Sequence, residues 1–400
     1  MDFNLPDEHD PRRKDIREWF EANPNASYQQ IAERGFSAPN WPAPWGLSAD
    51  PELQFIIDEE FLRAGIVPPH DFNPIAVNQC GQSLLVHGTE EQRQTYLPPA
   101  LACEHTWCML FSEPSGGSDV AAIRTSAVRD GDDYIINGQK IWTSAADRAE
   151  IGILVARTDP SVPKHKGLSQ FILDMSLPGI TVNPIFDMTG ETNEYNEVFF
   201  DNVRVPASCL LGREGEGWKL VVEQLQTERS AMTKPGAVWG FGPTARELVS
   251  GLIETGAIKD PLVRDDAARL YIEGELLRLL VFRGMSNRIN GQPAGLEGNV
   301  GKMIASPHGQ ALSELAKRTQ GASGMIKNDD VLPLPDKPYG IFSNWDYAYW
   351  FAPAATLGVG TQEILKNTIA ERVLGLPRDE DPTARIPFNE ASKARLKSVG

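Results

Sequence analysis

The stretch VRDGDDYIINGQK, residues 128–140, decides the fold class of this chain. Its arms carry β-branched and aromatic residues, and the Asp-Gly and Asn-Gly pairs within it are turn signals. The pattern predicts a β-hairpin or a meander of short strands. A region of β-structure is therefore expected near the middle of the chain.

Further short runs of β-branched and aromatic residues lie on both sides of this hairpin, from about residue 105 to about residue 212. The runs are HTWCMLFSEPSGG, IGILVARTD, QFILDM, GITVNPI and NEVFFDNVRVP. Turn residues separate them, as in a small antiparallel β domain. We place this middle domain at residues 105–213.

The sequence outside the middle domain has the spacing of amphipathic helices. Apolar residues recur every three or four positions between residue 12 and about residue 104. The same period returns in segments at 216–234, 242–256, 261–290, 296–320 and 360–373, with a loop-like region at 325–350. The order predicts an α+β protein: an N-terminal all-α domain (1–104), the middle β domain (105–213) and a C-terminal helical-bundle domain (214–400).

The composition excludes several classes of protein. The chain has 400 residues, 41% of them hydrophobic and 23% charged, with a net charge of -16, and its mean hydropathy is -0.31. These values are typical of a globular protein large enough for several subdomains. The negative charge argues against nonspecific nucleic-acid binding, and no apolar run is long enough to cross a membrane.

The cysteines and histidines predict neither a disulfide framework nor a metal site. Cys80, Cys103, Cys108 and Cys209 form no CxxC pair, and the six histidines form no HxxxH or HExxH motif. The polar N-terminus has no signal-peptide pattern, so we expect reduced cysteines and a cytoplasmic protein.

Two stretches carry candidate ligand-binding residues. LFSEPSGGSDVAAI, residues 110–123, has small residues that let a backbone approach a ligand and offer N–H groups to an anion. INGQKIWTSAAD, residues 136–147, places Trp142 beside Thr143 and Ser144, a combination that can cover a ring and bond its polar edge. Taken singly, the first also fits an ordinary Gly/Ser connection, and the second fits a core tryptophan.

A third stretch, KLVVEQLQTERSAMTK at residues 219–234, contains a candidate general base. Glu228 falls on the same helical stripe as Val221, Leu225 and Met232. Two interpretations follow from the position alone. The carboxylate lies at the edge of the stripe and reaches water, or it is half-buried and abstracts a proton.

Taken together and in this order, the motifs resemble the acyl-CoA dehydrogenase family of flavoenzymes. They are SEPSGGSD, NGQKIWTS, NEVFFDNVRVP and GEGW ahead of a helix. The resemblance spans nearly the whole chain and is strongest at 109–235 and 355–374. It implies the three-domain layout, an FAD cofactor and a role in lipid metabolism such as β-oxidation. The implied reaction dehydrogenates an acyl-CoA thioester to its trans-2-enoyl-CoA.

The resemblance also implies a set of FAD contacts. Ser144 takes the place of the threonine that most members have near the reactive flavin nitrogen, and Trp142 covers the ring there. The implied cofactor-binding residues are Met109, Phe111, Ser112, Gly117, Ser118, Trp142, Ser144, Thr361 and Gln362.

The chain departs from the common family pattern at the base. Most members have the catalytic glutamate in a Tyr-Glu-Gly sequence near the C-terminus, where this chain has Val359. A minority, including the long-chain and isovaleryl types, supply it from the helix after the β domain, just before an arginine. That position is Glu228, followed by Arg229, so the resemblance favours Glu228 as the base. Ser118, Arg229 and the backbone N–H of Val359 are the implied substrate contacts.

A second departure concerns the half of the FAD site that a neighbouring subunit supplies in many members. The usual Arg-x-x-Phe-Gly segment is missing, and KRTQGASG replaces Gln-x-x-Gly-Gly, so Arg318 or Gln320 is expected to take over. The family implies a homodimer or homotetramer and an electron-transfer flavoprotein as acceptor. Two alternatives remain: a non-catalytic or half-site subunit of a heteromer, and a flavin oxidase or monooxygenase. The acyl group, whether fatty, branched, steroid or aromatic, is not determined.

Overall fold

The structure is a computed structural model that describes residues 5–189, 194–231, 236–238, 241–292, 297–326, 345–378 and 381–391; the side chains of 227–231, 238, 241 and 297 are not described. The chain forms two compact units. One comprises residues 15–49, 57–225 and 378–400, and we call it the β unit. The other comprises residues 1–14, 50–56 and 226–377, and we call it the helical unit.

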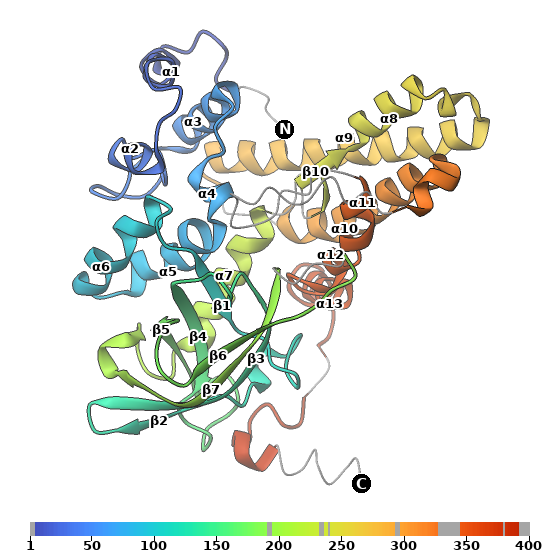
Figure 1. The fold of residues 1–400 in the computed structure, drawn as a ribbon. Coiled ribbons are helices and arrows are strands. Elements are labelled where there is room, and N and C mark those ends of the chain that lie inside the picture. The colour runs from blue at the N-terminus through green and yellow to red at the C-terminus, as the bar shows by residue number, and fades with distance from the viewer. Residues whose placement is uncertain are drawn as a thin grey trace. The chain divides into compact units, whose positions relative to one another are not determined.

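One sheet organises the β unit, and its strands run in the order β6-β7-β3-β2-β4-β5-β8 (Figure 1). The predicted hairpin is confirmed: β2 (Ser126–Asp130) pairs antiparallel with β3 (Asp133–Ser144). Most other pairs are antiparallel too, but β1 (Trp107–Leu110) lies parallel to β4 (Ile151–Arg157). The remaining strands are β5 (Leu168–Asp174), β6 (Ile180–Pro184), β7 (Tyr195–Pro206) and β8 (Leu210–Leu211).

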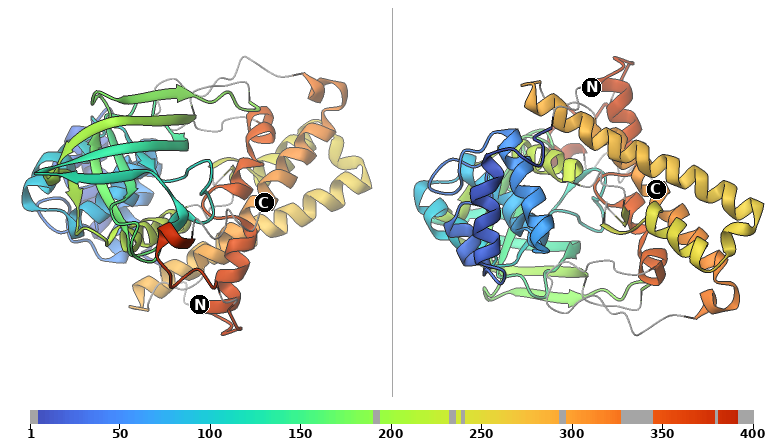
Figure 2. Two further views of the ribbon diagram at one scale, coloured as in Figure 1. Left: turned by 90° about the horizontal axis from the view of Figure 1, so that it is seen from below. Right: turned by 90° about the horizontal axis from the view of Figure 1, so that it is seen from above.

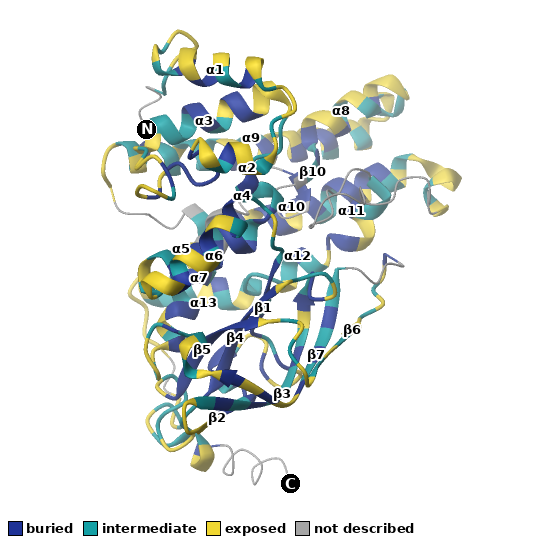
Figure 3. Cartoon of the chain, turned by 60° about the vertical axis from the view of Figure 1, so that its left-hand side comes forward, coloured by how far each residue is buried: buried dark blue, intermediate teal, exposed yellow. Residues whose placement is uncertain are grey.

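A hydrophobic core packs against one face of this sheet, and its central strands are buried on both faces. Tyr134 and Ile136 alternate with less buried residues along β3, as the period of a strand requires. They pack with Leu154 of β4 and Phe171 of β5, and β4 is buried along its whole length (Figure 3). The packed residues lie in the first part of β3, and the candidate residues of NGQKIWTS form its remaining part, up to its end at Ser144.

Helices of the β unit precede the sheet in sequence. They are α2 (Tyr28–Glu33), α4 (Pro69–Phe72), a π-helical turn (Ile75–Gln79), α5 (Cys80–His87) and α6 (Glu90–Leu101). Two further helices, α1 (Arg12–Ala22) and α3 (Pro51–Ala64), have residues in both units. Phe20, Phe36 and Phe61 pack their rings together. The predicted helical N-terminal zone is therefore present.

The helical unit is built on two long helices that lie side by side, α9 (Pro261–Ile289) and α10 (Glu297–Thr319) (Figure 2). Asp260 caps the first turn of α9, with a proline at the first helical position. The other helices are α8 (Ala245–Glu254), α11 (Trp345–Phe351), α12 (Ala354–Leu357) and α13 (Gln362–Arg372). These confirm the predicted C-terminal helices.

Two details of the helical unit differ from the prediction. A two-stranded ribbon, β9 (Gly236–Val238) and β10 (Phe241–Thr244), precedes α8. The region 325–350 was expected to be a loop, but α11 begins at Trp345; residues 327–344 lie outside the described residues. The boundary between the units falls within α7 (Gly217–Ala231), after Leu225. The three domain boundaries from the sequence stay a prediction.

No helix in the described part of the chain is long and apolar enough to cross a membrane.

Candidate functional site

The Gly-rich loop that follows β1 forms a tight turn with an exposed tip. Glu113 and Gly116 exchange two backbone hydrogen bonds, of 3.1 and 2.9 Å, which close the turn. Gly117 and Ser118 are exposed beyond it, and a Cβ on Gly117 would meet no atom within 4 Å. The loop therefore leaves the Gly117 backbone and the exposed Ser118 accessible to a ligand, as expected of a ligand-binding loop.

A buried ion pair ties this loop to β3. The Nζ of Lys140 lies 2.9 Å from Glu113 Oε1 and donates to the backbone carbonyl of Phe111 at 3.0 Å. Glu113 also accepts hydrogen bonds from the N–H groups of Arg124 and Thr125, at 2.6 and 2.9 Å. The Glu113 carboxylate thus joins the two ends of the loop, and the Lys140 ammonium joins the loop to strand β3.

The pair is ionised although it is almost inaccessible to water. Burial raises the pKa of Glu113, but the Lys140 ammonium and hydrogen bonds from Thr125 and Arg124 outweigh this effect and leave the pKa below its ordinary value. Burial lowers the pKa of Lys140 to about 8, an effect that Glu113 partly offsets. Buried pairs of this kind fix geometry, because removing one partner leaves an uncompensated charge.

Trp142 points outward from the end of β3. The register between β3 and β7 shifts between Lys140 and Thr143, and Trp142 has a φ of 59°, a conformation that bulky residues rarely adopt. Its side chain is 58% exposed and its ring meets Tyr195 edge-on at 5.8 Å between centroids. Trp142 is therefore not a core tryptophan.

A backbone hydrogen bond joins the loop to the end of β3. The Ser112 carbonyl accepts it, at 3.0 Å, from the N–H of Ile141, next to Trp142. The two segments offer the exposed Trp142, the partly exposed Ser112 and Ser144, and the open backbone at Gly117. A flat ring system with a polar edge and an anionic tail needs these groups. Met109 on β1 is partly buried and Phe111 is buried.

In the helical unit, a strained turn precedes α13. Val359 has a φ of 61° and Gly360 a φ of 92°, and a β-branched residue in this conformation is an outlier. The buried Lys302 donates from Nζ to the Gly360 carbonyl at 2.9 Å. Thr361 caps α13, and Gln362 donates from Nε2 to the Met303 carbonyl at 3.4 Å.

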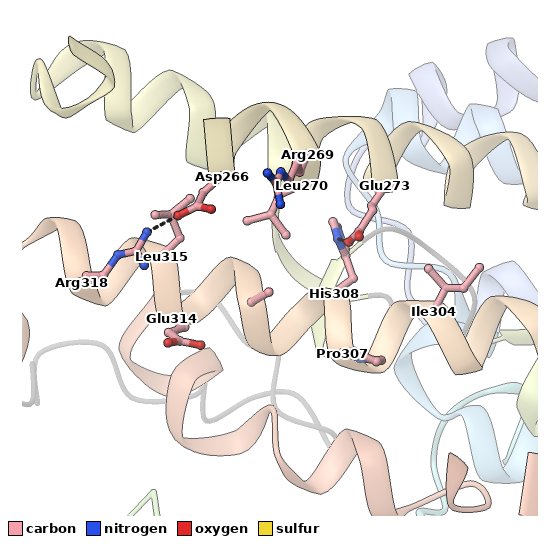
Figure 4. A pocket seen from close by; sticks show the side chains of 11 residues that line it. Asp266, Arg269, Leu270, Glu273, Ile304, Pro307, His308, Glu314, Leu315 and Arg318 are labelled. Atoms are coloured by element: carbon pink, nitrogen blue, oxygen red, sulfur yellow. Dashed lines mark hydrogen bonds and ion pairs between the residues drawn. The ribbon is translucent and has the colours of Figure 1, made fainter. Parts of the chain in front are cut away.

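Arg318 lies at the end of α10, at the rim of a groove between α9 and α10 (Figure 4). Its guanidinium forms an ion pair with Asp266 of α9. His308 and Glu273 form another pair in the same groove, with 3.1 Å between Nδ1 and Oε2. The groove thus has both signs of charge, and the expected contact of Arg318 with FAD stays a prediction.

Glu228 and Arg229 belong to α7, but their side chains lie outside the described part of the structure. The preceding turn of α7 is well anchored. Gln224 exchanges two side-chain hydrogen bonds, of 2.8 and 3.0 Å, with Gln170 of β5.

Three of the residues that build these sites were not predicted from the sequence. Glu113 and Lys140 each lie inside a quoted motif, and their opposite charges are a signal that could have paired them. Lys302 gives no such signal, because it lies on a helix distant in sequence from the turn that it holds.

Comparison with known proteins agrees with this architecture. Family models match along the chain: Acyl-CoA dehydrogenase, N-terminal domain at 6–104, middle domain at 108–203 and C-terminal domain at 215–374. Acyl-CoA dehydrogenase FadE34 of Mycobacterium tuberculosis is 36% identical over 87% of this chain. The chain spans about half of that relative's length, 46%.

Acyl-CoA dehydrogenase IpdE1 of the same organism is 36% identical over 88% of this chain and 87% of its own length. A solved structure described as "Tcur3481-Tcur3483 steroid ACAD" is 28% identical, with a TM-score of 0.75 over 95% of this chain and 100% of that chain. The expectation from the motifs is confirmed: the chain belongs to the acyl-CoA dehydrogenase family, whose members are FAD-binding flavoproteins.

Proposed function

We propose that the chain catalyses the FAD-dependent α,β-dehydrogenation of an acyl-CoA thioester to the trans-2-enoyl-CoA. The observation that carries the proposal is that the exposed Trp142 and the partly exposed Ser144 lie at the end of β3, next to Ile141, whose N–H bonds the Gly-rich loop at Ser112. FAD, when bound, supplies a two-electron acceptor for the β hydrogen of the substrate.

The residues of the β unit hold and orient the cofactor. Trp142 covers one part of the ring, and Ser144 offers a hydroxyl donor to its polar edge. Ser112, Gly117 and Ser118 offer donors to the ring and the phosphates. The Glu113–Lys140 pair keeps this loop in place through the hydrogen bonds described above, so that little reorganisation is needed on binding.

Glu228 is the base that removes the α proton in this proposal. A thioester α C–H is weakly acidic, so a carboxylate must be positioned for it, and donors must stabilise the charge that develops on the carbonyl oxygen. Val359 cannot act as a base. Its N–H has no acceptor among the described residues, which supports a role as a donor to the thioester carbonyl. Arg229 and Ser118 are the other proposed substrate contacts.

The acyl group in this proposal carries rings. The similar structure is named a steroid acyl-CoA dehydrogenase, and the valine at position 359 is smaller than the glutamate of most members, which leaves room beside the C-terminal turn. Electrons pass on to an electron-transfer flavoprotein.

The proposed assembly is an oligomer in which a second subunit completes the FAD-binding site. The similar steroid acyl-CoA dehydrogenase structure is named for two proteins, Tcur3481 and Tcur3483, and this chain lacks the usual Arg-x-x-Phe-Gly segment. These two observations favour a mixed oligomer with a related chain over a homo-oligomer.

Anaerobic flavin bleaching tests the function. The purified chain, alone and with candidate partner subunits, is mixed with steroid, branched and straight-chain acyl-CoAs while the visible flavin spectrum is recorded. Bleaching by a ring-bearing acyl-CoA is the expected result. Bleaching by short straight chains only would contradict the substrate assignment. Flavin that no acyl-CoA bleaches, with or without a partner, would contradict the reaction.

A further inference from the structure

The Glu194 carboxyl is hydrogen-bonded to the Ser144 hydroxyl. Ser144 ends β3 and pairs with Tyr195, the first residue of β7. Glu194 immediately precedes that strand, and its carbonyl accepts a hydrogen bond of 3.0 Å from the N–H of Ala145. Backbone and side-chain contacts therefore hold the carboxyl against the hydroxyl that we assign to the flavin edge.

The surroundings of Glu194 disfavour its charged form. Glu194 is partly buried, and burial raises the pKa of its carboxyl to about 7. The hydrogen bond from Ser144 and the charge of Arg148 oppose this rise in pKa, and Asp187 and Asp147 reinforce it. Both aspartates are engaged: Asp187 Oδ1 accepts from Thr189, and Asp147 Oδ1 accepts from Arg148 at 3.2 Å.

The two protonation states of Glu194 leave Ser144 in different states. A serine hydroxyl has one hydrogen to donate and an ionised carboxylate can only accept. Ionised Glu194 therefore takes the Ser144 hydrogen for itself. Protonated Glu194 donates its own hydrogen to Ser144 Oγ, and this leaves the serine hydrogen free to point elsewhere.

We propose that Glu194 is a positioning residue, whose carboxyl decides whether the Ser144 hydroxyl hydrogen points at Glu194 or toward the flavin edge. The inference rests on the proposed function, because it uses Ser144 as the flavin-facing donor. It predicts that flavin properties depend on the protonation of a group that does not touch the flavin. The hydroxyl either donates to the ring or is turned away from it, so protonation of Glu194 shifts the flavin reduction potential.

The first test needs no flavin. The full chain with ¹³C-labelled glutamate carboxyls is titrated by NMR, and the Glu194 signal is assigned by its loss in Glu194→Gln. The expected pKa lies near 7 and rises in Ser144→Ala, since the hydroxyl stabilises the carboxylate. An ordinary pKa that Ser144→Ala leaves unchanged would overturn the inference.

The second test uses the flavin-loaded protein. Its visible spectrum and reduction potential are measured against pH for wild type, Glu194→Gln and Ser144→Ala. Because glutamine keeps a donor, wild type should match the potential of Glu194→Gln below pH 7 and depart from it above pH 7. Ser144→Ala should remove that step.

Glu197→Gln is the matched control for both tests. Glu197 lies on the same strand, but its Oε1 accepts from Gln139 at 3.3 Å, so this variant should keep the step. A wild-type potential that differs from Glu194→Gln by the same amount at every pH would overturn the inference even if the flavin is bound and reduced by substrate. A chain that binds no flavin would contradict the proposed function, and the NMR titration would still decide whether Glu194 and Ser144 are coupled.

Discussion

Two turns of the molecule, one in each unit, are each held by a buried lysine that donates to a backbone carbonyl. In the β unit, Lys140 Nζ donates to the Phe111 carbonyl at 3.0 Å. In the helical unit, Lys302 Nζ donates to the Gly360 carbonyl at 2.9 Å. The first turn keeps the family's motif residues beside it. The second has Val359 at the position where the family resemblance implies the catalytic glutamate of most members. Yet Val359 adopts a left-handed conformation that its side chain disfavours.

The comparison shows that a turn can keep its backbone conformation when its side chain is not suited to that conformation. A φ of 61° is unfavourable for a valine, so contacts around the turn, such as the Lys302 hydrogen bond to Gly360, must stabilise this conformation. In the proposed function, this turn supplies a backbone donor and Glu228 of α7 supplies the base.

The largest effect is expected for Glu228→Gln. Removing a general base lowers a rate by roughly 10²–10⁴-fold, so turnover with the best acyl-CoA should fall by that factor while flavin content stays unchanged. Steady-state kinetics with an artificial electron acceptor measure this. Glu223→Gln, on the same helix, is the matched control, because Glu223 pairs with His87 at 2.8 Å. Equal losses in both variants would mean a structural role.

Lys140→Met should destabilise the β unit. It leaves Glu113 buried without its cation, a change that costs about 3–5 kcal/mol. Urea unfolding measures the loss. The double variant Lys140→Met/Glu113→Gln should recover part of it, because no buried charge remains.

Arg204→Met is the exposed counterpart for this experiment. The exposed Arg204 lies 2.6 Å from Asp130 and 2.9 Å from Asp133, and exposed pairs contribute at most about 1 kcal/mol each. A loss for Lys140→Met as small as that for Arg204→Met would contradict the role of Lys140 in holding the Gly-rich loop.

Lys302→Met should cost less than Lys140→Met. It removes a hydrogen bond from a charged group to the Gly360 carbonyl, worth about 1.5–3 kcal/mol. Unfolding followed by tryptophan fluorescence measures the change. Lys366→Met on the exposed side of α13 serves as control and should be nearly neutral. A neutral Lys302→Met would show that the turn is held by other contacts.

The smallest effect is expected for Val359→Gly, and its sign is unusual. Most valine-to-glycine changes destabilise, but glycine accepts a φ of 61° without strain. The variant should therefore be as stable as wild type or more stable by about 1 kcal/mol. Val373→Gly, at a position with a φ of -111°, should destabilise. A drop for Val359→Gly as large as for Val373→Gly would mean that the turn is not strained.

Local patterns predicted a large part of this fold. The hairpin at 128–140 and the helices at 261–290 and 296–320 lie within short stretches, where turn residues and apolar spacing are sufficient. The parallel pairing of β1 with β4 could not be predicted, because the choice of a strand partner depends on contacts distant in sequence. The ribbon before α8 is too short for its pattern to be distinctive.

The candidate site was predictable at the level of motifs and not of contacts. Trp142, Ser144 and the Gly-rich loop were named from their residue types. The outward direction of Trp142 was not, because it depends on a register shift against β7. The partners Glu113, Lys302 and Glu194 were missed, since each acts on a residue that only the folded chain brings near.

The most direct test of the central claim moves the base back to the C-terminal turn. Anaerobic bleaching of the flavin by the best acyl-CoA is followed in Glu228→Gln and in the double variant Glu228→Gln/Val359→Glu. If the turn has kept the family's backbone and Glu228 has taken over its chemistry, the single variant does not bleach and the double variant regains measurable bleaching. A single variant that bleaches at the wild-type rate would contradict the account.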